Sequence, residues 1–111
     1  MAQETQTDKG PRIPLDQEKI KAFCERWKIV EFSLFGSVLT DEFRPDSDVD
    51  VMVTFADDAP WTIFDMVDLE NELEKIVKRK VDVVTRLSVE RSANYILRKS
   101  ILNTSRMYYG A

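Results

Sequence analysis

Residues 48–55, with the sequence DVDVMVTF, place an apolar side chain at every second position, which predicts a β-strand with one buried face. Asp48 and Asp50 then share the opposite face. At the rise of a strand, their Cα atoms lie about 6.6 Å apart. Carboxylates at this separation can converge on one cation or bridge two, and Mg²⁺ suits them because it combines a few carboxylates with water and phosphate oxygens.

A Gly-Ser turn precedes this strand by ten residues. Residues 29–35 are largely apolar and predict a buried strand that ends at Gly36 and Ser37, after which a short helix can follow. Because Gly36 has no Cβ, backbone N–H groups and the Ser37 hydroxyl can approach phosphate oxygens closely. The chain contains no histidine, which excludes a Ser-His-Asp hydrolase with Ser37 as nucleophile.

A third carboxylate, Asp82, lies within the β-branched run of residues 80–85. A charged residue in such a strand is costly to bury unless it is paired or binds a metal. If the two strands are neighbours, three carboxylates face one cleft, as a two-metal phosphoryl-transfer site requires. Taken singly, each feature also has an ordinary explanation, as a turn, an exposed strand face or a solvated edge residue.

Together and in this order, these features resemble the signature of the nucleotidyltransferase superfamily that includes DNA polymerase β. Residues 35–53, FGSVLTDEFRPDSDVDVMV, are also similar to the minimal nucleotidyltransferase (MNT) domains of prokaryotes, which are found beside HEPN-domain toxins. The resemblance covers about residues 28–109. Together with the alternation of expected helices and strands, it implies an α/β fold with a small mixed sheet and helices mainly on one face.

The resemblance implies an Mg²⁺-dependent enzyme, with two ions, that transfers AMP from ATP to a hydroxyl group, by expectation on a tyrosine, of a cognate HEPN-domain ribonuclease toxin. The chain would then be the antitoxin of a hetero-oligomeric pair. The expected catalytic and metal-binding residues are Asp48, Asp50 and Asp82. The expected nucleotide-binding residues are Gly36, Ser37, Arg44 and Ser47.

One departure from the family pattern leaves other functions open. Many relatives carry an Ala-Arg-Gly-like stretch shortly after the Gly-Ser turn, whereas this chain has Leu39, Thr40 and Asp41 and so lacks that basic contact. Arg44 could replace it, or could pair with neighbouring acidic residues instead. A second hypothesis is therefore a non-catalytic antitoxin that acts by complex formation. A third is a small-molecule nucleotidyltransferase that completes its pocket by homodimerisation.

The composition narrows the class of protein. The length of 111 residues predicts one domain, at residues 14–111, after a polar tail at 1–13 that we expect to be disordered and not a signal peptide. The net charge of −4 argues against direct nucleic-acid binding, and no apolar run is long enough to span a membrane. The single cysteine, Cys24, is expected in the core and fits a cytoplasmic location.

The remaining elements follow from caps and apolar stripes. One helix is expected to begin after Asp16, another to run from Thr62 to about residue 79 with Asp65 completing a capping box, and a third to be capped by Ser88 and extend to about residue 102. Residues 107–109 predict an edge strand.

Several side chains on these elements have two readings. Trp61 and Phe64 could stack on a nucleotide base, although packing against the sheet is the commoner outcome. The acids at 68–74 are expected on a solvated helix face, and the basic residues at 75–80 on a charged helix end. A second basic cluster could face an acidic or phosphorylated partner. It comprises Arg91, Arg98 and Lys99.

Overall fold

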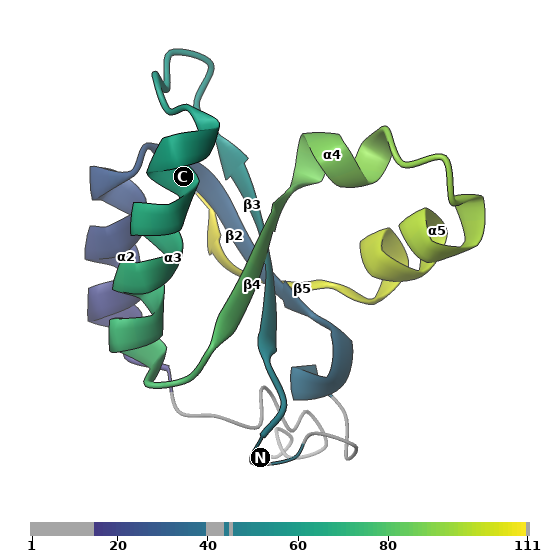
Figure 1. The fold of residues 1–111 in the computed structure, drawn as a ribbon, viewed down its shortest axis with the longest axis horizontal. Helices are drawn as coiled ribbons and strands as arrows, with labels where there is room; N and C mark the ends of the chain where they lie inside the picture. The colour runs from purple at the N-terminus through teal and green to yellow at the C-terminus, as the bar shows by residue number, and fades with distance from the viewer. Residues whose placement is uncertain (1–14, 40–43, 45, 111) are drawn as a thin grey trace, which may run out of the picture.

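The fold is a mixed β-sheet with helices on both sides, seen in a computed structural model that describes residues 15–39, 44 and 46–110 (Figure 1). Within this part of the chain the strand order is β4-β3-β2-β5, with β3 and β4 parallel and the other pairs antiparallel. The strands are β2 (Ile29–Phe35), β3 (Val49–Phe55), β4 (Val81–Thr85) and β5 (Arg106–Gly110). The predicted α/β class and mixed sheet are confirmed, whereas the tail at 1–13 lies outside the described residues.

The helices divide between the two sides of the sheet and do not lie mainly on one face as predicted. On one side lie α2 (Gln17–Arg26) and α3 (Ile63–Val77), and on the other lie α4 (Arg86–Glu90) and α5 (Tyr95–Thr104) (Figure 1). A short 3₁₀ helix, η1 (Gly36–Leu39), follows β2 directly. No helix in the described ranges is both long enough and apolar enough to cross a membrane.

The main core lies between the sheet and the pair α2 and α3. Val49, Val51 and Val53 are fully buried there, so the alternation of residues 48–55 places its apolar face as predicted. The helices contribute Phe23 and Leu69, which are also fully buried. Since β3 is central in the sheet, the strand that carries the carboxylates is held from both of its edges and from one face.

The predicted starts of α2 and α3 are confirmed. The Asp16 carboxylate accepts hydrogen bonds from the backbone N–H groups of Glu18 and Lys19, at 3.1 and 3.2 Å. At α3, the Thr62 backbone N–H donates to the Asp65 carboxylate at 2.8 Å, which is the reciprocal half of a capping box. Local hydrogen-bonding signals in the sequence therefore locate both helix starts.

The single helix predicted from Ser88 to about residue 102 is wrong, because the segment forms two helices. The cap is Thr85, whose Oγ1 accepts from the Ser88 N–H at 3.1 Å, so α4 begins as soon as β4 ends. The helix is interrupted where Ser92 Oγ accepts from the Asn94 N–H at 3.2 Å and Asn94 Oδ1 accepts from the Leu97 N–H at 3.0 Å. Such side-chain bonds compete with a continuous helix and cap a new one.

The two aromatic residues near the start of α3 differ in environment. Trp61 packs against the core, with its ring 4.8 Å from that of Trp27, and its Nε1 donates to the Trp27 carbonyl at 2.6 Å. Phe64 is 81% exposed, so the expectation that it packs against the sheet is wrong. Neither ring lies against the carboxylate end of β3.

The acidic face predicted on α3 is not simply solvated. The carboxylates of Glu74 and Glu70 accept from the backbone N–H groups of Val81 and Val83, at 3.2 and 3.1 Å. Because β4 is an edge strand, these glutamates occupy donors that would otherwise be open to another strand. Glu72 also has partners, since it accepts from Trp27 Nε1 at 3.1 Å and pairs with Arg26.

Cys24 is predicted to be chemically inert in the folded protein. The side chain is fully buried, and burial, followed by the charge of Glu25, raises the pKa of its thiol from 9.0 to about 12. Since the thiolate is the nucleophile, iodoacetamide at pH 8 should modify Cys24 only after unfolding in denaturant, as mass spectrometry can measure. The raised pKa also means that stability falls as pH rises from about 9 toward 12, because the unfolded chain releases this proton first. Rapid modification of Cys24 by iodoacetamide in the folded chain would contradict the prediction that this thiol is inert.

Candidate active site

Strand register brings Asp50 and Asp82 side by side. Asp50 of β3 pairs with Asp82 of β4 in parallel register and with Phe35 of β2 on its other side. Since the valines of β3 face the core, Asp50 lies on the opposite sheet face, and Asp48 directly precedes the strand. The two strands are therefore adjacent, as predicted. Asp50 is partly buried, and Asp48 and Asp82 are exposed.

Gly36 lies against the Asp50 carboxylate. Its φ of +81° belongs to the left-handed region, and a Cβ added there would lie 2.4 Å from Asp50 Oδ2. Ser37 follows within η1 and is partly buried. The Gly-Ser turn and Asp50, separate in sequence, therefore meet at one point of the structure.

The electrostatics of the site favour a cation. Burial raises the pKa of Asp50, and the negative charges of Asp82 and then Asp48 raise it further. A bound divalent cation would relieve this repulsion, and an all-oxygen donor set is the kind that Mg²⁺ prefers.

The carboxylates do not yet converge, however. In the portion of the chain that the structure describes, no three acidic, cysteine or histidine side chains are gathered closely enough to hold a metal ion. Asp50 and Asp82 occupy paired positions on adjacent strands, which lie about 4.8 Å apart, a spacing that lets two carboxylates share one cation. The donors present thus fit Mg²⁺ in chemistry, and the metal-binding roles stay predictions.

Arg44 and Ser47 form a turn just before Asp48. Ser47 Oγ accepts from the Arg44 N–H at 3.0 Å, and the Ser47 N–H donates to the Arg44 carbonyl, also at 3.0 Å. The side chain of Arg44 is exposed. The hydroxyl of Ser47 is therefore engaged within the loop, and contact of either residue with a nucleotide remains a prediction. Of the residues that depart from the family pattern, Leu39 packs against the core, while Thr40 and Asp41 lie outside the described residues.

Arg79 holds this loop in place, a role that the sequence did not reveal. Its Nη1 donates to the carbonyls of Ser47 and Arg44, at 3.2 and 3.3 Å. The left-handed conformation of Lys78, with φ of 62°, ends α3 and turns the chain toward the loop. In sequence, Arg79 is one of several basic residues at a helix end, and nothing local distinguishes it from its exposed neighbours.

Replacing Arg79 by alanine should lower nucleotide transfer by about 10- to 100-fold, because a displacement of about 1 Å at a reacting group has an effect of this order. Arg79→Lys should retain only part of the activity. Lysine keeps the positive charge and can still donate hydrogen bonds, but its ammonium group cannot reproduce the planar geometry of the guanidinium. The measurement is kcat at saturating nucleotide, with Lys75→Ala as the control because Lys75 is an exposed basic residue in the last turn of α3, shortly before Arg79. Equal rates for the two alanine variants would show that the loop does not need Arg79.

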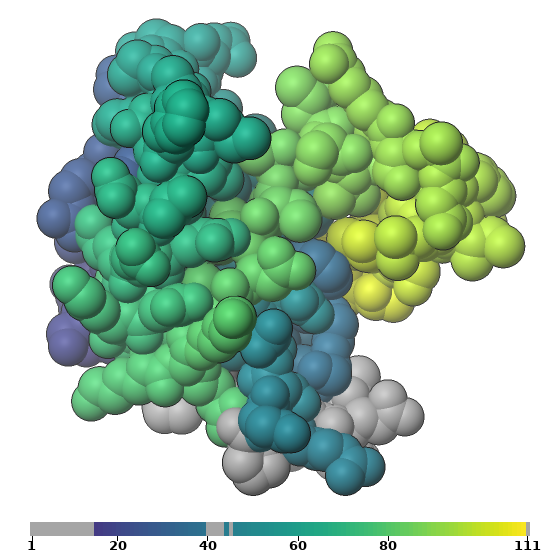
Figure 2. Space-filling view, viewed as in Figure 1, coloured from purple at the N-terminus to yellow at the C-terminus, as the bar shows by residue number. Residues whose placement is uncertain are grey.

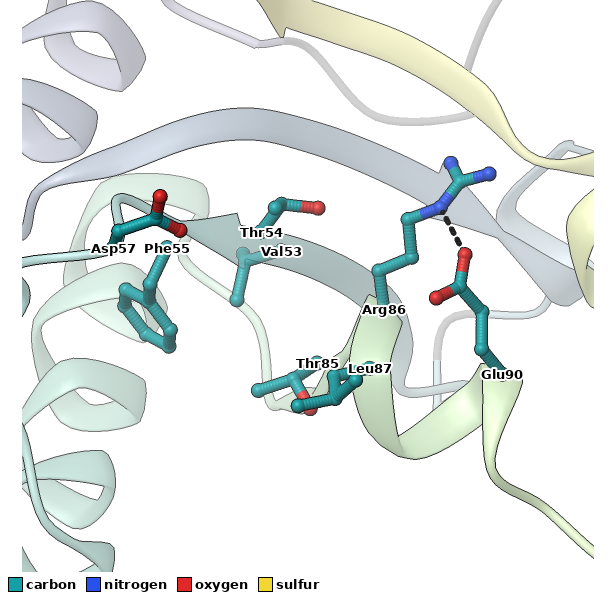
Figure 3. A pocket seen from close by; sticks show the side chains of 8 residues that line it. All are labelled: Val53, Thr54, Phe55, Asp57, Thr85, Arg86, Leu87 and Glu90. Carbon is teal, nitrogen blue, oxygen red and sulfur yellow. Dashed lines mark hydrogen bonds and ion pairs between the residues drawn. The ribbon is translucent and has the colours of Figure 1, made fainter.

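Two hollows lie at the other end of β3, away from the carboxylates. The larger has a volume of about 340 Å³ and lies between the strand ends and α4, with the Arg86–Glu90 ion pair, at 2.9 Å, on its rim (Figure 3). The second, of about 320 Å³, shares Phe55 and Thr85 with the first and extends to the start of α3. In Figure 2 the surface is hollowed between the start of α3 and α4. These hollows include none of the predicted site residues.

Comparison with known proteins identifies the family of this chain. A model of the nucleotidyltransferase domain family matches residues 17–106. The protein adenylyltransferase MntA of Thermococcus cleftensis is 33% identical over 82 residues, which span 73% of this chain and 81% of that protein.

Solved structures share the fold. A toxin-antitoxin crystal structure with AMP-PNP superimposes with a TM-score of 0.66 at 24% identity, covering 87% of this chain and 75% of that one. A complex of a tri-AMPylated Shewanella oneidensis HEPN toxin with its MNT antitoxin matches with a TM-score of 0.58 at 24% identity, covering 86% and 70%. At these identities the structures establish the fold alone. The resemblance carried by residues 35–53 is confirmed by the family match and the MntA relative, and the chain belongs to the nucleotidyltransferase domain family, as an enzyme with a nucleotide substrate.

Proposed function

We propose that this chain transfers AMP from ATP to a tyrosine hydroxyl of a HEPN-domain ribonuclease toxin in the cytoplasm, and so neutralises the toxin with which it forms a hetero-oligomer. The name of the Thermococcus relative supports a protein acceptor and an adenylyl group. The tri-AMPylated toxin in the Shewanella complex supports a HEPN protein as that acceptor. The AMP-PNP complex of another structural relative supports ATP as the donor.

The observation that carries the proposal is the contact between Gly36 and Asp50. A phosphate-binding turn and a metal-binding carboxylate are useful for the same chemistry only if they lie together. The space that a Cβ at Gly36 would need is occupied by Asp50 Oδ2, at 2.4 Å. With Asp82 at the paired position of β4, the same small area can hold both a triphosphate and its counterions.

The roles divide between the turn and the carboxylates. Gly36 and Ser37 secure the triphosphate through backbone N–H groups and the Ser37 hydroxyl. Asp48 and Asp50 would hold two Mg²⁺ ions, with Asp82 on the catalytic one, and when bound these ions neutralise charge on the attacking and leaving oxygens. The acceptor oxygen forms a bond to the α-phosphorus, the bond to pyrophosphate breaks, and Asp82 orients the acceptor hydroxyl and helps to remove its proton.

Co-expression with the product of the neighbouring gene tests the proposal. Intact-mass spectrometry of that product should show the addition of one or more AMP units, and peptide mapping should place them on tyrosine. Radiolabelled ATP with purified proteins provides the same test in vitro, with omission of Mg²⁺ expected to stop transfer. A stable complex with unchanged masses would contradict catalysis.

That contrary outcome is the second candidate function, a binding antitoxin without transfer. Two observations favour it: no three described carboxylates are gathered around a metal position, and the chain has Leu39, Thr40 and Asp41 where many relatives carry an Ala-Arg-Gly-like stretch. Under this hypothesis the toxin is inhibited equally by the wild-type chain and by a chain with neutralised carboxylates.

A further inference from the structure

Helices α4 and α5 and strand β5 carry exposed apolar side chains that the proposed chemistry does not use. We call this set of side chains the α5 surface. Its most exposed member is Ile96, at 79%. It consists of Leu87, Tyr95, Ile96, Leu97 and Met107. Figure 2 shows α4 and α5 as a lobe that projects from the body formed by α2 and α3.

Helix α5 is poorly supported by its own chain. None of its ten residues is buried. An isolated helix of this length is marginal in water, and most helices gain stability from packing an apolar face. The polar contacts that support α5 include its Asn94 cap and Arg98, which donates to the carbonyls of Glu90 and Ser92 at 3.3 and 3.2 Å. The exposed apolar residues of α5 are thus available to pack against another protein surface.

The charge around this surface is opposite to that of the rest of the chain. Residues 86–110 contain five Lys or Arg residues and one acidic residue, in a chain with 16 basic and 20 acidic residues. Lys99 and Arg98 lie near the ring of Tyr95, at 5.9 and 5.4 Å from its centroid. A partner that covers this surface must therefore combine apolar side chains with acidic ones.

The α5 surface lies on the same side of the sheet as the candidate active site. Met52 alternates with Asp50 on the outer face of β3, and it is buried outside the main core, as is Val89 of α4. The helices α4 and α5 therefore flank the sheet face that carries Asp50 and Asp82 (Figure 1). A protein docked on α5 would therefore lie on the same side of the sheet as the carboxylates.

A second copy of this chain fits the surface less well. Symmetric pairing would place one basic α5 surface against another. The other exposed apolar cluster, formed by Ile63, Phe64 and Val67 at the start of α3, lies on the opposite side of the sheet (Figure 1). Joining this cluster to α5 would be a head-to-tail contact, which generates rings or open chains and no closed dimer.

We propose that the α5 surface docks an acidic, partly apolar face of the protein acceptor and delivers its hydroxyl group to the carboxylates. The identity of that acceptor rests on the function proposed above. The probe is the purified product of the neighbouring gene, and binding is measured by titration calorimetry without ATP, separately from transfer of labelled AMP.

The decisive variant is Ile96→Asp, with Ile63→Asp as its matched control. Both isoleucines are 79% exposed and lie in the first turn of a helix, where an aspartate is favourable, so neither change should impair folding. Ile96→Asp should weaken binding of the probe about 30-fold or more, the effect of losing a central interface residue. Lys99→Glu should weaken it in the same direction, with Lys75→Glu as its control. ATP binding should be unchanged in all four variants.

The outcomes separate this proposal from the proposed function. If the wild type binds the probe without transferring AMP, and Ile96→Asp abolishes binding, the docking surface stands and the enzymatic function fails. If Ile96→Asp binds as tightly as Ile63→Asp, or if the wild type does not bind the probe, the docking surface is overturned. Light scattering that shows a wild-type oligomer dissolved by Ile96→Asp would assign the surface to a second copy and would also overturn the proposal.

Discussion

Replacing Asp48 and Asp50 together by asparagine should reduce AMP transfer by about 1,000-fold or more, while the fold is retained. Asparagine keeps the shape of aspartate and removes its charge, so the site loses the negative charge needed to hold divalent cations against a triphosphate. Loss of a single preorganised electrostatic contact commonly lowers rates by about 10²- to 10³-fold, and here two are removed. Transfer of label from ATP to the partner protein measures the effect.

The same variant should be no less stable than the wild type. Asp50 faces Asp82 across paired strand positions, where like charges are destabilising, and both burial and these charges raise the pKa of Asp50. Because its neutral form is the one favoured by folding, Asp50 contributes stability at low pH that is lost as pH rises through its pKa. Neutralising it should therefore hold or raise the melting temperature at pH 7.

Asp68→Asn is the matched control, since Asp68 is exposed on α3 and on the other side of the sheet. It should transfer AMP at the wild-type rate. Normal transfer by the double variant would remove the carboxylates from the mechanism. Loss of transfer accompanied by a lower melting temperature would mean that the carboxylates are needed for folding, and would leave the catalytic assignment without support.

The parts of this site that the sequence predicts are those governed by local rules. The period of two along residues 48–55 decides which face of β3 carries Asp50, because a shift of one residue would bury the carboxylates. Asp16 and Asp65 are recognisable because a cap acts within three residues of itself. The pairing of Asp50 with Asp82 can also be predicted from the sequence. Their two β-branched segments are connected by a helix, and strands connected in this way commonly lie side by side in parallel.

The parts that the sequence does not predict depend on long-range partners. Glu70 resembles any exposed helix glutamate until β4 is placed beside α3 and offers it the Val83 N–H. Arg79 is likewise indistinguishable from its basic neighbours until the loop before Asp48 is brought within 3.2 Å of its guanidinium. The sequence does not predict the break between α4 and α5, because apolar residues continue through it and the side-chain bonds of Ser92 and Asn94 that interrupt the helix are short-range and individually weak.

Replacing Gly36 by alanine should lower AMP transfer by about 100-fold or more and also destabilise the protein. Two effects combine at this position. A φ of +81° costs a residue with a Cβ about 1–2 kcal/mol. The new Cβ would also lie 2.4 Å from Asp50 Oδ2, so the carboxylate or the turn must move, and a displacement of about 1 Å in a catalytic group has a 10²-fold effect. Thermal unfolding and the rate of transfer measure the two consequences separately.

A double-mutant cycle separates the strain of the turn from the clash with the carboxylate. In an Asp50→Ala background the atom that meets the new Cβ is gone, so Gly36→Ala should cost less stability than in the wild type and retain only the backbone contribution. Gly110→Ala is the control, because Gly110 lies in β5, away from the carboxylates. A Cβ there would lie 3.0 Å from the Met107 sulfur, which is at the end of a flexible side chain. Equal costs in the two backgrounds would show that Gly36 is required for the turn alone. A loss of stability that occurs only in the wild-type background would show that glycine is required at position 36 because Asp50 lies against the phosphate-binding turn.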